Sequence, residues 1–543
     1  MPLEGFPAKS LAHPLVWAVL LGLALSAIFF DAFPYDVLAY HGPFASLATG
    51  LPRLANYGMT LSMEHRFQGF PPLWRWLLAP GLGLGLPRLM AIPNLAALGA
   101  LAWSARATLR IPWFVSSAAA LLFPIALFGF RTPYQDFFVG ALTAAAVLWL
   151  MESLRHWAES GQGARAAWIA LPLVLAASLT KFQGLFQVWL ALALTALAVA
   201  VIGWRRGRPA ARWWLGPLPV LLLTLLLSGL HPLHNLLAHH NPFFPIAAGP
   251  FAGPEMREAN ASPAYTSALG PLQTFLNHWL SASELDWIAR GVVPSYTLDQ
   301  ARAQTQYGGL VDPRALTGLV RSGGSFGPAY LAAMAAYGVA FVQALGQWRR
   351  TGTLSAQGWP VLAVAPLLLL APGLPQSHEL RYYLALLTLP ALTALGWWWE
   401  HGSRRWLELG LLSLLSIALL LNFSQPLHST INGLRKGQGL QYAVGYPTRD
   451  LPSVQDCLRP GGTQPRSVGT LRLPAVMAFG CRLQVPGEVR VEELEGSTPS
   501  QVQPEGGAKG WSVPGATRGP LAERAQATAA LDPLGSRVSA EPQ

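Results

Sequence analysis

The chain has 543 residues, of which 52% are hydrophobic and only 12% are charged, whereas a soluble globular protein carries about 25% charged residues. Its net charge of +11 is spread between apolar runs, without the basic stripe and interleaved aromatic residues of a nucleic-acid-binding surface. The composition therefore excludes an ordinary soluble domain and a nucleic-acid partner, and it predicts an integral membrane protein.

Apolar runs long enough to cross a bilayer recur from the N-terminus to about residue 422. A transmembrane helix needs roughly 20 apolar residues, and on this measure the sequence predicts about 11 spans. They lie near 14–30, 89–105, 111–130, 134–151, 167–180, 184–203, 215–230, 327–346, 358–374, 380–398 and 406–422. We expect the first to be a retained helix rather than a cleaved signal peptide, because Phe-Phe-Asp-Ala-Phe-Pro follows it instead of a small-x-small cleavage site.

The distribution of basic residues decides how the spans are counted. With a cytoplasmic N-terminus, the short inner connections hold Lys9, Arg106, Arg110, Arg155, Arg165, Arg205, Arg206, Arg208, Arg212, Arg349, Arg350, Arg404 and Arg405. The outer segments hold fewer, namely Arg53, Arg66, Arg75, Arg88, Arg131, Lys181 and Arg381. Segment 72–86 is short and interrupted by Gly and Pro, and counting it as a span would place the basic clusters outside, against the positive-inside rule. We therefore predict a juxtamembrane or re-entrant helix there.

The fold class we expect is an all-α polytopic membrane protein with a small α+β or β-rich extracytoplasmic segment at its C-terminus. The expected boundaries are 1–425 for the transmembrane domain, 31–88 for the first periplasmic loop, 231–326 for the large periplasmic loop, 426–495 for the small domain and 496–543 for a disordered tail. The tail is rich in Pro, Gly, Ala, Ser and Gln. Cys457 and Cys481 lie in the small domain, and whether they form a disulfide stays open.

Ionisable residues gather where the predicted spans meet the outer face, and each charge near a membrane is costly enough to need a reason. The candidates are Asp31, Asp36, Glu64, His65, Asp136, Lys181, Glu379 and Arg381. On the predicted topology all of them lie at one membrane face. We therefore expect them to be available to a single site.

The stretches around these residues resemble the GT-C glycosyltransferases, which are polytopic enzymes that use lipid-phosphate-linked sugars. After the first span, FPYDVLAYHGPFASLATG places Asp36, Tyr40 and His41 where bacterial members carry an Asp and then Tyr-His. The stretches that follow in family order are FPPLWRWLLAP, the acidic residue Asp136, NPFFPI at 241–246 and LRYYLALLTLP at 380–390. The protein is thus similar to the bacterial protein mannosyltransferase and aminoarabinose transferase families.

The resemblance implies an inverting transfer on the periplasmic side of a bacterial inner membrane. Asp36 would deprotonate an acceptor hydroxyl, which attacks the anomeric carbon of the sugar while polyprenyl phosphate leaves. Asp136 would be a second acidic residue of the catalytic site, positioning acceptor or donor. The substrate-binding residues would be Tyr40, His41, Lys181, Glu379, Arg381 and Tyr382, with Arg381 and Lys181 on the lipid phosphate. The implied partners are a polyprenyl-phosphate-linked sugar, a lipid, glycan or protein acceptor, and membrane lipids. Metal dependence stays open.

The sequence departs from the family pattern at two points. Val37 follows Asp36 where well-known members carry a second acidic residue, and Gln68 and Gly69 precede the Pro-Pro step where some bacterial transferases carry a basic residue. These departures put the identity of the sugar and the source of phosphate binding in doubt.

Each candidate residue also has a structural interpretation. Asp36 can cap a helix at 37–49, Asp136 can favour the N-terminus of the fourth span through the helix dipole, and Lys181 and Arg381 can be snorkelling interface residues. Glu64 and His65 can ligate a metal, although adjacent loop residues seldom face one site. The histidines of HPLHNLLAHHNP, His231, His234, His239 and His240, have partly zinc-compatible spacing but suit packing better.

Two other functions compete with glycosyl transfer. A polysaccharide polymerase or ligase would place basic and His residues in the large loop, which holds Arg257, Arg290, Arg302, Arg314 and Arg321. A transporter or flippase of cell-envelope lipids would favour broken helices near mid-membrane and repeated halves, and the sequence shows neither. The early Asp36 loop favours the glycosyltransferase.

Overall fold

The structure, a computed structural model, describes residues 41–48, 61–84, 87–121, 133–209, 212–213, 216–247, 250–253, 327–375 and 380–401, with a few isolated positions between them. The predicted spans near 14–30 and 406–422, the small domain at 426–495, the tail at 496–543 and both cysteines lie outside the described residues. The total of about 11 spans therefore stays a prediction.

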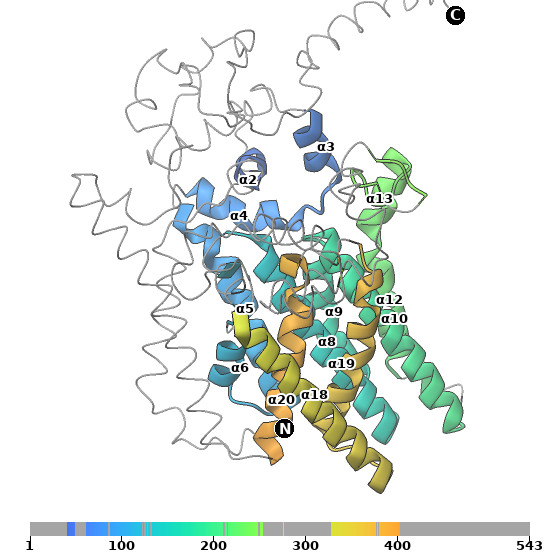
Figure 1. Ribbon diagram of the computed structural model, residues 1–543. Coiled ribbons are helices and arrows are strands. Elements are labelled where there is room, and N and C mark those ends of the chain that lie inside the picture. Colours follow the sequence, from blue (N-terminus) through green and yellow to red (C-terminus); the bar gives the residue numbers. More distant parts are fainter. Residues whose placement is uncertain are drawn as a thin grey trace, which may run out of the picture.

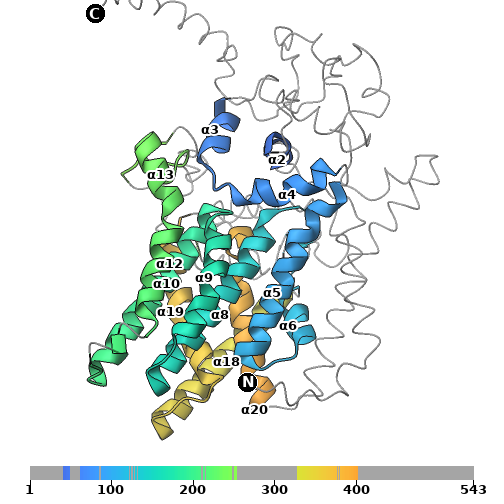
Figure 2. The ribbon, with the colours of Figure 1, turned by 180° about the vertical axis from the view of Figure 1, so that it is seen from behind.

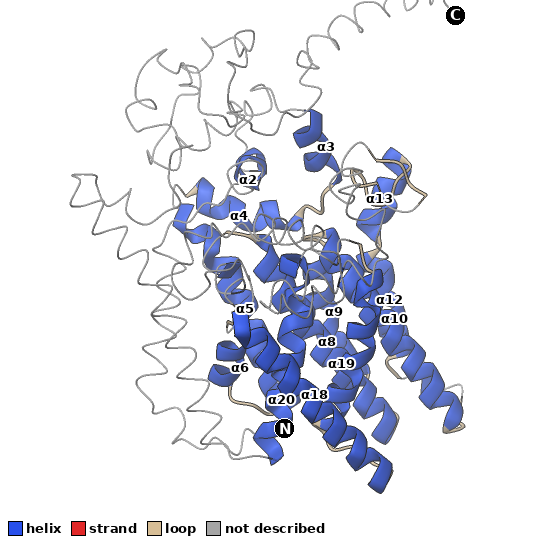
Figure 3. Cartoon of the chain, in the orientation of Figure 1, coloured by secondary structure: helices blue, strands red, loops and turns tan. Residues whose placement is uncertain are grey.

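The described part of the chain is helical, and no β-strand occurs in it (Figure 3). The bundle helices are α5 (Ile92–Leu109), α6 (Trp113–Ala120), α8 (Gln135–Ser160), α9 (Ala164–Ser178), α10 (Phe182–Arg205), α12 (Leu218–Ser228), α18 (Gly327–Thr351), α19 (Gly358–Leu370) and α20 (Leu384–His401). Shorter helices are α2 (Gly42–Ala48), α3 (Leu61–Gly69), α4 (Leu73–Gly83) and α13 (Leu230–His239), with 3-10 turns η3 (Pro87–Ala91), η4 (Ala371–Gly373) and η5 (Leu380–Tyr383). The all-α prediction is confirmed for these residues.

The two ends of the bundle differ. Figures 1 and 2 show α2, α3, α4 and α13 at one end, which we call the pocket end. The C-terminal ends of α8, α10 and α18 lie at the opposite end, which we call the basic end, since they carry Arg205, Arg349 and Arg350. The starts of α8 and α10, beside which Asp136 and Lys181 lie, are therefore at the other end of the bundle from these basic residues (Figure 1). That the basic end faces the cytoplasm stays a prediction.

Helix α8 is the centre of the bundle and packs against α5, α9, α10 and α20. Its side chains are buried around the whole helix, as expected for a helix that is apolar on every face. Small residues make this possible, because Ala144, Ala145 and Ala146 are fully buried and let neighbouring backbones approach. The helix ends at Gly161, whose positive φ of 78° suits glycine and whose N–H donates to the Trp157 carbonyl at 3.1 Å.

Three helical stretches in the described part are long and apolar enough to cross a membrane, namely Gln135–Ser160, Phe182–Arg205 and Leu218–His239. The stretches Ala164–Ser178 and Gly358–Gly373 are apolar but shorter. Every predicted span that falls on described residues contains a helix, although α6 covers only part of the stretch predicted at 111–130. Within segment 72–86, residues Leu73–Gly83 form the short helix α4, which lies across the pocket end (Figure 1), as expected for a juxtamembrane helix.

Polar side chains inside the bundle find partners on neighbouring helices, as an apolar solvent requires. Trp149 Nε1 of α8 donates to Ser104 Oγ of α5 at 3.0 Å. Gln357 Nε2, just before α19, donates to the Leu109 carbonyl at the end of α5 at 2.7 Å. These bonds fix helices that are far apart in the sequence.

We expect Gly140→Ala to destabilise the bundle. Gly140 faces α20, and an added Cβ would meet Leu384 Cβ at 2.6 Å; overpacking of this kind costs about 1–3 kcal/mol. The measurement is the midpoint of thermal unfolding in a mild detergent. Gly338→Ala is the matched control, because nothing lies within 4 Å of the added Cβ on α18. Equal midpoints for the two variants would contradict close packing of α8 on α20.

Candidate active site

An ion pair at the pocket end joins two central helices. Asp136 lies in the first turn of α8, where a carboxylate is favoured by the helix dipole, and Lys181 immediately precedes α10 in an extended conformation. Lys181 Nζ donates to Asp136 Oδ1. The Lys181 side chain is only 13% exposed and the Asp136 side chain only 6%, so each charge depends on the other for compensation.

A third segment covers this ion pair. The Lys181 ammonium lies 3.7 Å from the centroid of the Tyr382 ring, a cation–π contact. Tyr382 belongs to η5, which packs against both α8 and α10. Gln187 of α10 holds it there, because its Nε2 donates to the Tyr382 carbonyl at 2.9 Å and to the Gln183 carbonyl at 2.9 Å. Three of the predicted site residues, Asp136, Lys181 and Tyr382, are therefore in direct contact.

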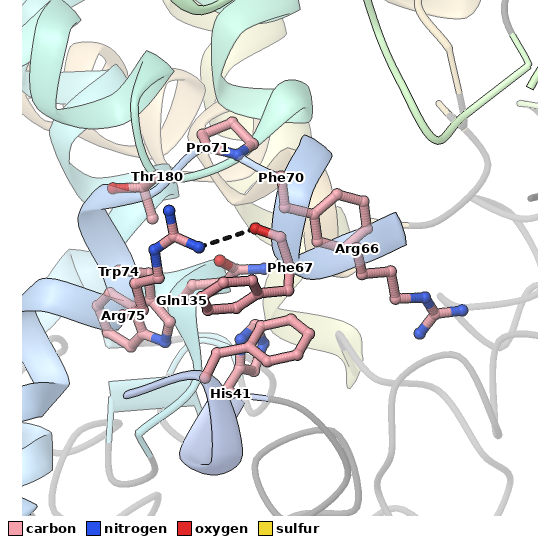
Figure 4. Close-up of a pocket in the computed structure, with 10 residues that line it drawn as sticks. His41, Arg66, Phe67, Phe70, Pro71, Trp74, Arg75, Gln135 and Thr180 are labelled. Carbon is pink, nitrogen blue, oxygen red and sulfur yellow. Dashed lines mark hydrogen bonds between the residues drawn. The ribbon is translucent and has the colours of Figure 1, made fainter. Parts of the chain in front are cut away.

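A small cavity of about 20 Å³ adjoins the ion pair. Its lining consists of His41, Phe44, Arg66, Phe67, Phe70, Pro71, Trp74, Arg75, Gln135 and Thr180 (Figure 4). Gln135 directly precedes Asp136, and Thr180 directly precedes Lys181. Each member of the ion pair is therefore the chain neighbour of a residue that lines the pocket. A cavity of about 20 Å³ has room for about one water molecule, and its wall is mainly aromatic with a few polar groups.

Two cations line this pocket. Arg75 of α4 donates from Nη1 to the Phe67 carbonyl at 2.8 Å, and its guanidinium carbon lies 4.4 Å from the centroid of the Phe67 ring. Burial lowers the pKa of Arg75, but an arginine keeps its charge at neutral pH. Arg66 of α3 is half-buried. His41, a predicted site residue, is buried with its ring edge-on to Tyr134 at a centroid distance of 6.2 Å.

The turn between α3 and α4 is pressed against the segment NPFFPI. An added Cβ on Gly69 would lie 2.3 Å from the Phe244 carbonyl oxygen, so only glycine fits there. The Gly69 carbonyl accepts from His231 Nε2 at 2.9 Å and from Asn235 Nδ2 at 2.9 Å. The departure from the family pattern at this position thus has a packing reason, because no basic side chain can replace Gly69.

Segment 241–246 is itself ordered by an asparagine. Asn241 Oδ1 accepts from the Phe243 N–H at 2.8 Å, and Asn241 Nδ2 donates to the carbonyls of Ile246 and Ala252, each at 2.9 Å. The Phe244–Pro245 peptide bond is cis. This folded segment is the support on which the α3–α4 turn lies.

The histidines near this turn make packing contacts. His65 lies edge-on to Phe244 at a centroid distance of 5.4 Å, and His239 stacks on the same ring at 3.9 Å. The His231 and His234 rings are stacked at 6.5 Å. Within the described ranges, no group of three or more His, Cys, Asp or Glu residues is arranged to hold a metal ion. The Glu64 side chain lies outside them, so the metal prediction for Glu64 and His65 stays open.

The remaining predicted residues are not placed. Asp31, Asp36, Tyr40 and Glu379 lie outside the described residues, and for Arg381 only the backbone, in η5 beside Tyr382, is described. Sequence reasoning did not select Arg75, Trp74, Gln135 or Gln187. One signal was available, since Gln183 and Gln187 are polar residues one turn apart in an apolar span and such residues need a partner.

Comparison with known proteins gives one structural similarity. No family model and no curated protein sequence matches the chain. Among solved structures, the chain is similar to ArnT from Cupriavidus metallidurans bound to undecaprenyl phosphate, at 16% identity over 88% of this chain and 85% of that chain, with a TM-score of 0.33. At this TM-score, conclusions about function have to come from the residues of the site itself.

We expect the ion pair to show strong coupling in a double-mutant cycle. Lys181→Met and Asp136→Asn each leave one buried polar or charged group without its partner, and breaking a buried pair costs about 3–5 kcal/mol. The double variant, Asp136→Asn/Lys181→Met, removes the charge imbalance and should be more stable than Lys181→Met alone. Thermal midpoints in detergent measure this. Losses that simply add in the double variant would show that the two groups act independently.

Proposed function

We propose that this integral membrane protein is a glycosyltransferase that moves a sugar from a polyprenyl-phosphate donor to an acceptor hydroxyl. The observation that carries the proposal is the joining of Asp136, Lys181 and Tyr382 beside an aromatic and cationic pocket at one end of the bundle. The family-like stretches in α4, segment 241–246 and η5 also lie at this end. The reaction faces the periplasm of a bacterial inner membrane.

The chemistry requires a base, a fixed electrophile and a stabilised leaving group. Asp36 takes the proton of the acceptor hydroxyl, and the hydroxyl oxygen forms a bond to the anomeric carbon. The bond between that carbon and the phosphate oxygen breaks, and polyprenyl phosphate leaves with the electron pair. A base must reach within about 3 Å of the hydroxyl, and α2 starts at Gly42, only six positions after Asp36, beside the pocket.

The ion pair changes the role we propose for Lys181. Its charge is compensated by Asp136 and its ammonium is covered by Tyr382, so this unit is suited to hold α8, α10 and η5 in register. Arg66 and Arg75 line the pocket, and guanidinium groups match the geometry of phosphate. Together with Arg381, they are the cations we propose for the departing phosphate.

Aromatic side chains suit the apolar faces of a sugar ring and the start of a polyprenyl chain, which both need more room than the cavity of about 20 Å³. Phe44, Phe67, Phe70 and Trp74 line the pocket with aromatic rings, while His41, Gln135 and Thr180 supply polar groups. A few polar groups in an otherwise apolar pocket fix the orientation of a ligand. The sugar and the acceptor remain to be identified by assay.

We expect Asp36→Asn to lower transfer by about 10²–10⁴-fold, the usual contribution of general base catalysis. The measurement is consumption of synthetic polyprenyl-phosphate-linked sugars by purified protein in lipid. Asp31→Asn is the matched control, because it neutralises a second acid of the same loop without removing the proposed base. Full activity of Asp36→Asn would overturn the assignment and favour a polymerase or ligase that works from the large loop.

The topology has its own test. With Cys457 and Cys481 replaced by Ser, we expect Ala238→Cys, exposed on α13 at the pocket end, to react in whole cells with a membrane-impermeant maleimide. Gln162→Cys, exposed between α8 and α9 at the opposite end, should react only after the membrane is opened. The reverse pattern would place the pocket in the cytoplasm and exclude a periplasmic reaction.

A further inference from the structure

The connection after α10 concentrates positive charge at the basic end. Arg205, Arg206, Arg208 and Arg212 lie within WRRGRPAARW at 204–213, directly where the apolar stretch Phe182–Arg205 ends. Trp204 at the start of this connection is 80% exposed. Tryptophan beside basic residues at the end of a span is typical of the lipid headgroup level. We call these four arginines the arginine cluster.

The cluster is fixed against the end of α8. Arg206 Nη1 donates to the Ala158 carbonyl, and Arg208 Nη2 donates to the same oxygen at 3.3 Å. The guanidinium of Arg208 lies over Trp157 at 4.4 Å. The Arg208 carbonyl accepts from Trp213 Nε1 at 3.1 Å. The described residues of the connection, 204–209 and 212–213, are therefore packed against the end of α8.

The protein does not balance this charge among its described residues. No carboxylate of the described ranges forms an ion pair with the cluster, because Glu152 and Glu159 of α8 are both engaged by Arg155, at 2.6 and 2.7 Å. Burial and the nearby charges of Arg206 and Arg212 lower the pKa of Arg208. Two of its donors, Nε and Nη1, are buried without a described partner. An anion is the ligand that would relieve this repulsion.

A lipid-exposed stripe leads along α10 to the cluster. Leu197 is 62% exposed and Val201 is 39% exposed, and with Trp204 they are spaced by four and three residues. Residues at this spacing lie on one face of a helix. An acyl chain against this stripe would bring its headgroup to Arg205 and Arg206, which are both exposed. A soluble anion would gain nothing from the apolar stripe.

We propose that the arginine cluster binds the phosphate of an anionic phospholipid in the leaflet at the basic end. Arginine offers planar pairs of donors that match phosphate oxygens. Basic residues next to a span attract anionic lipids electrostatically, and the part of the connection packed against α8 supplies a defined site for one headgroup. The site is separate from the pocket and does not depend on the proposed glycosyl transfer.

Native mass spectrometry of the full chain in detergent tests this site. Dioleoyl phosphatidylglycerol is the probe, and dioleoyl phosphatidylcholine is the neutral lipid with the same chains. We expect the wild type to retain phosphatidylglycerol in preference to phosphatidylcholine. Arg206→Gln/Arg212→Gln, which changes two exposed side chains, should weaken phosphatidylglycerol binding about 30-fold, which corresponds to about 2 kcal/mol at 1.4 kcal/mol per factor of ten.

Two further variants make the result specific. Arg349→Gln/Arg350→Gln removes the same charge from exposed positions at the end of α18 and should leave most of the binding in place. Arg206→Lys/Arg212→Lys keeps the charge and should restore part of the affinity, which separates charge loss from misfolding. Equal retention of both lipids, equal losses in the two glutamine variants, or full competition by millimolar inorganic phosphate would overturn the proposal.

Discussion

The ion pair between Asp136 and Lys181 is the constraint on which the pocket end depends. It joins the first turn of α8 to the start of α10, and Tyr382 lies over the ammonium, so three distant segments meet at one point. Two charges removed from water gain little net stability over an apolar contact. The role we assign to the pair is positional. It holds the start of α8 beside the start of α10, next to Gln135 and Thr180, which line the pocket.

The rest of the pocket is built outward from that point. Helix α4 carries Trp74 and Arg75 across the bundle, and the preceding turn fits against the backbone of Phe244 only because residue 69 is glycine. Segment 241–246 and α13 thereby support the α3–α4 turn from the other side. A region that belongs to the predicted large loop is thus part of the architecture of the site.

Much of the fold and part of the candidate site were predictable from the composition and from the order of apolar and charged segments along the chain. The helices, the short helix at 72–86 and the separation of basic connections from site candidates follow from hydropathy and charge. The sequence also selected Asp136, Lys181 and Tyr382. Their mutual contact was not predictable, because Asp136 and Lys181 are 45 positions apart and only helix packing decides which outer-face charges meet. Arg75 was passed over for a similar reason, since its contact with Phe67 depends on how α3 folds onto α4.

The enclosure of α8 has a mechanical consequence. Helix α8 has alanines buried against its neighbours, and its Gly140 lies so close to α20 that an added Cβ would meet Leu384 Cβ at 2.6 Å, so the helix has little room to slide or rotate. An alternating-access carrier requires one half of the bundle to rock against the other about the membrane midplane. In this fold such a motion would break the packing of α8 against α5, α9, α10 and α20. Helix α4 belongs to the same fixed core, because Trp74 and Leu78 are buried in it and the Leu73 N–H donates to the Leu179 carbonyl at 2.9 Å.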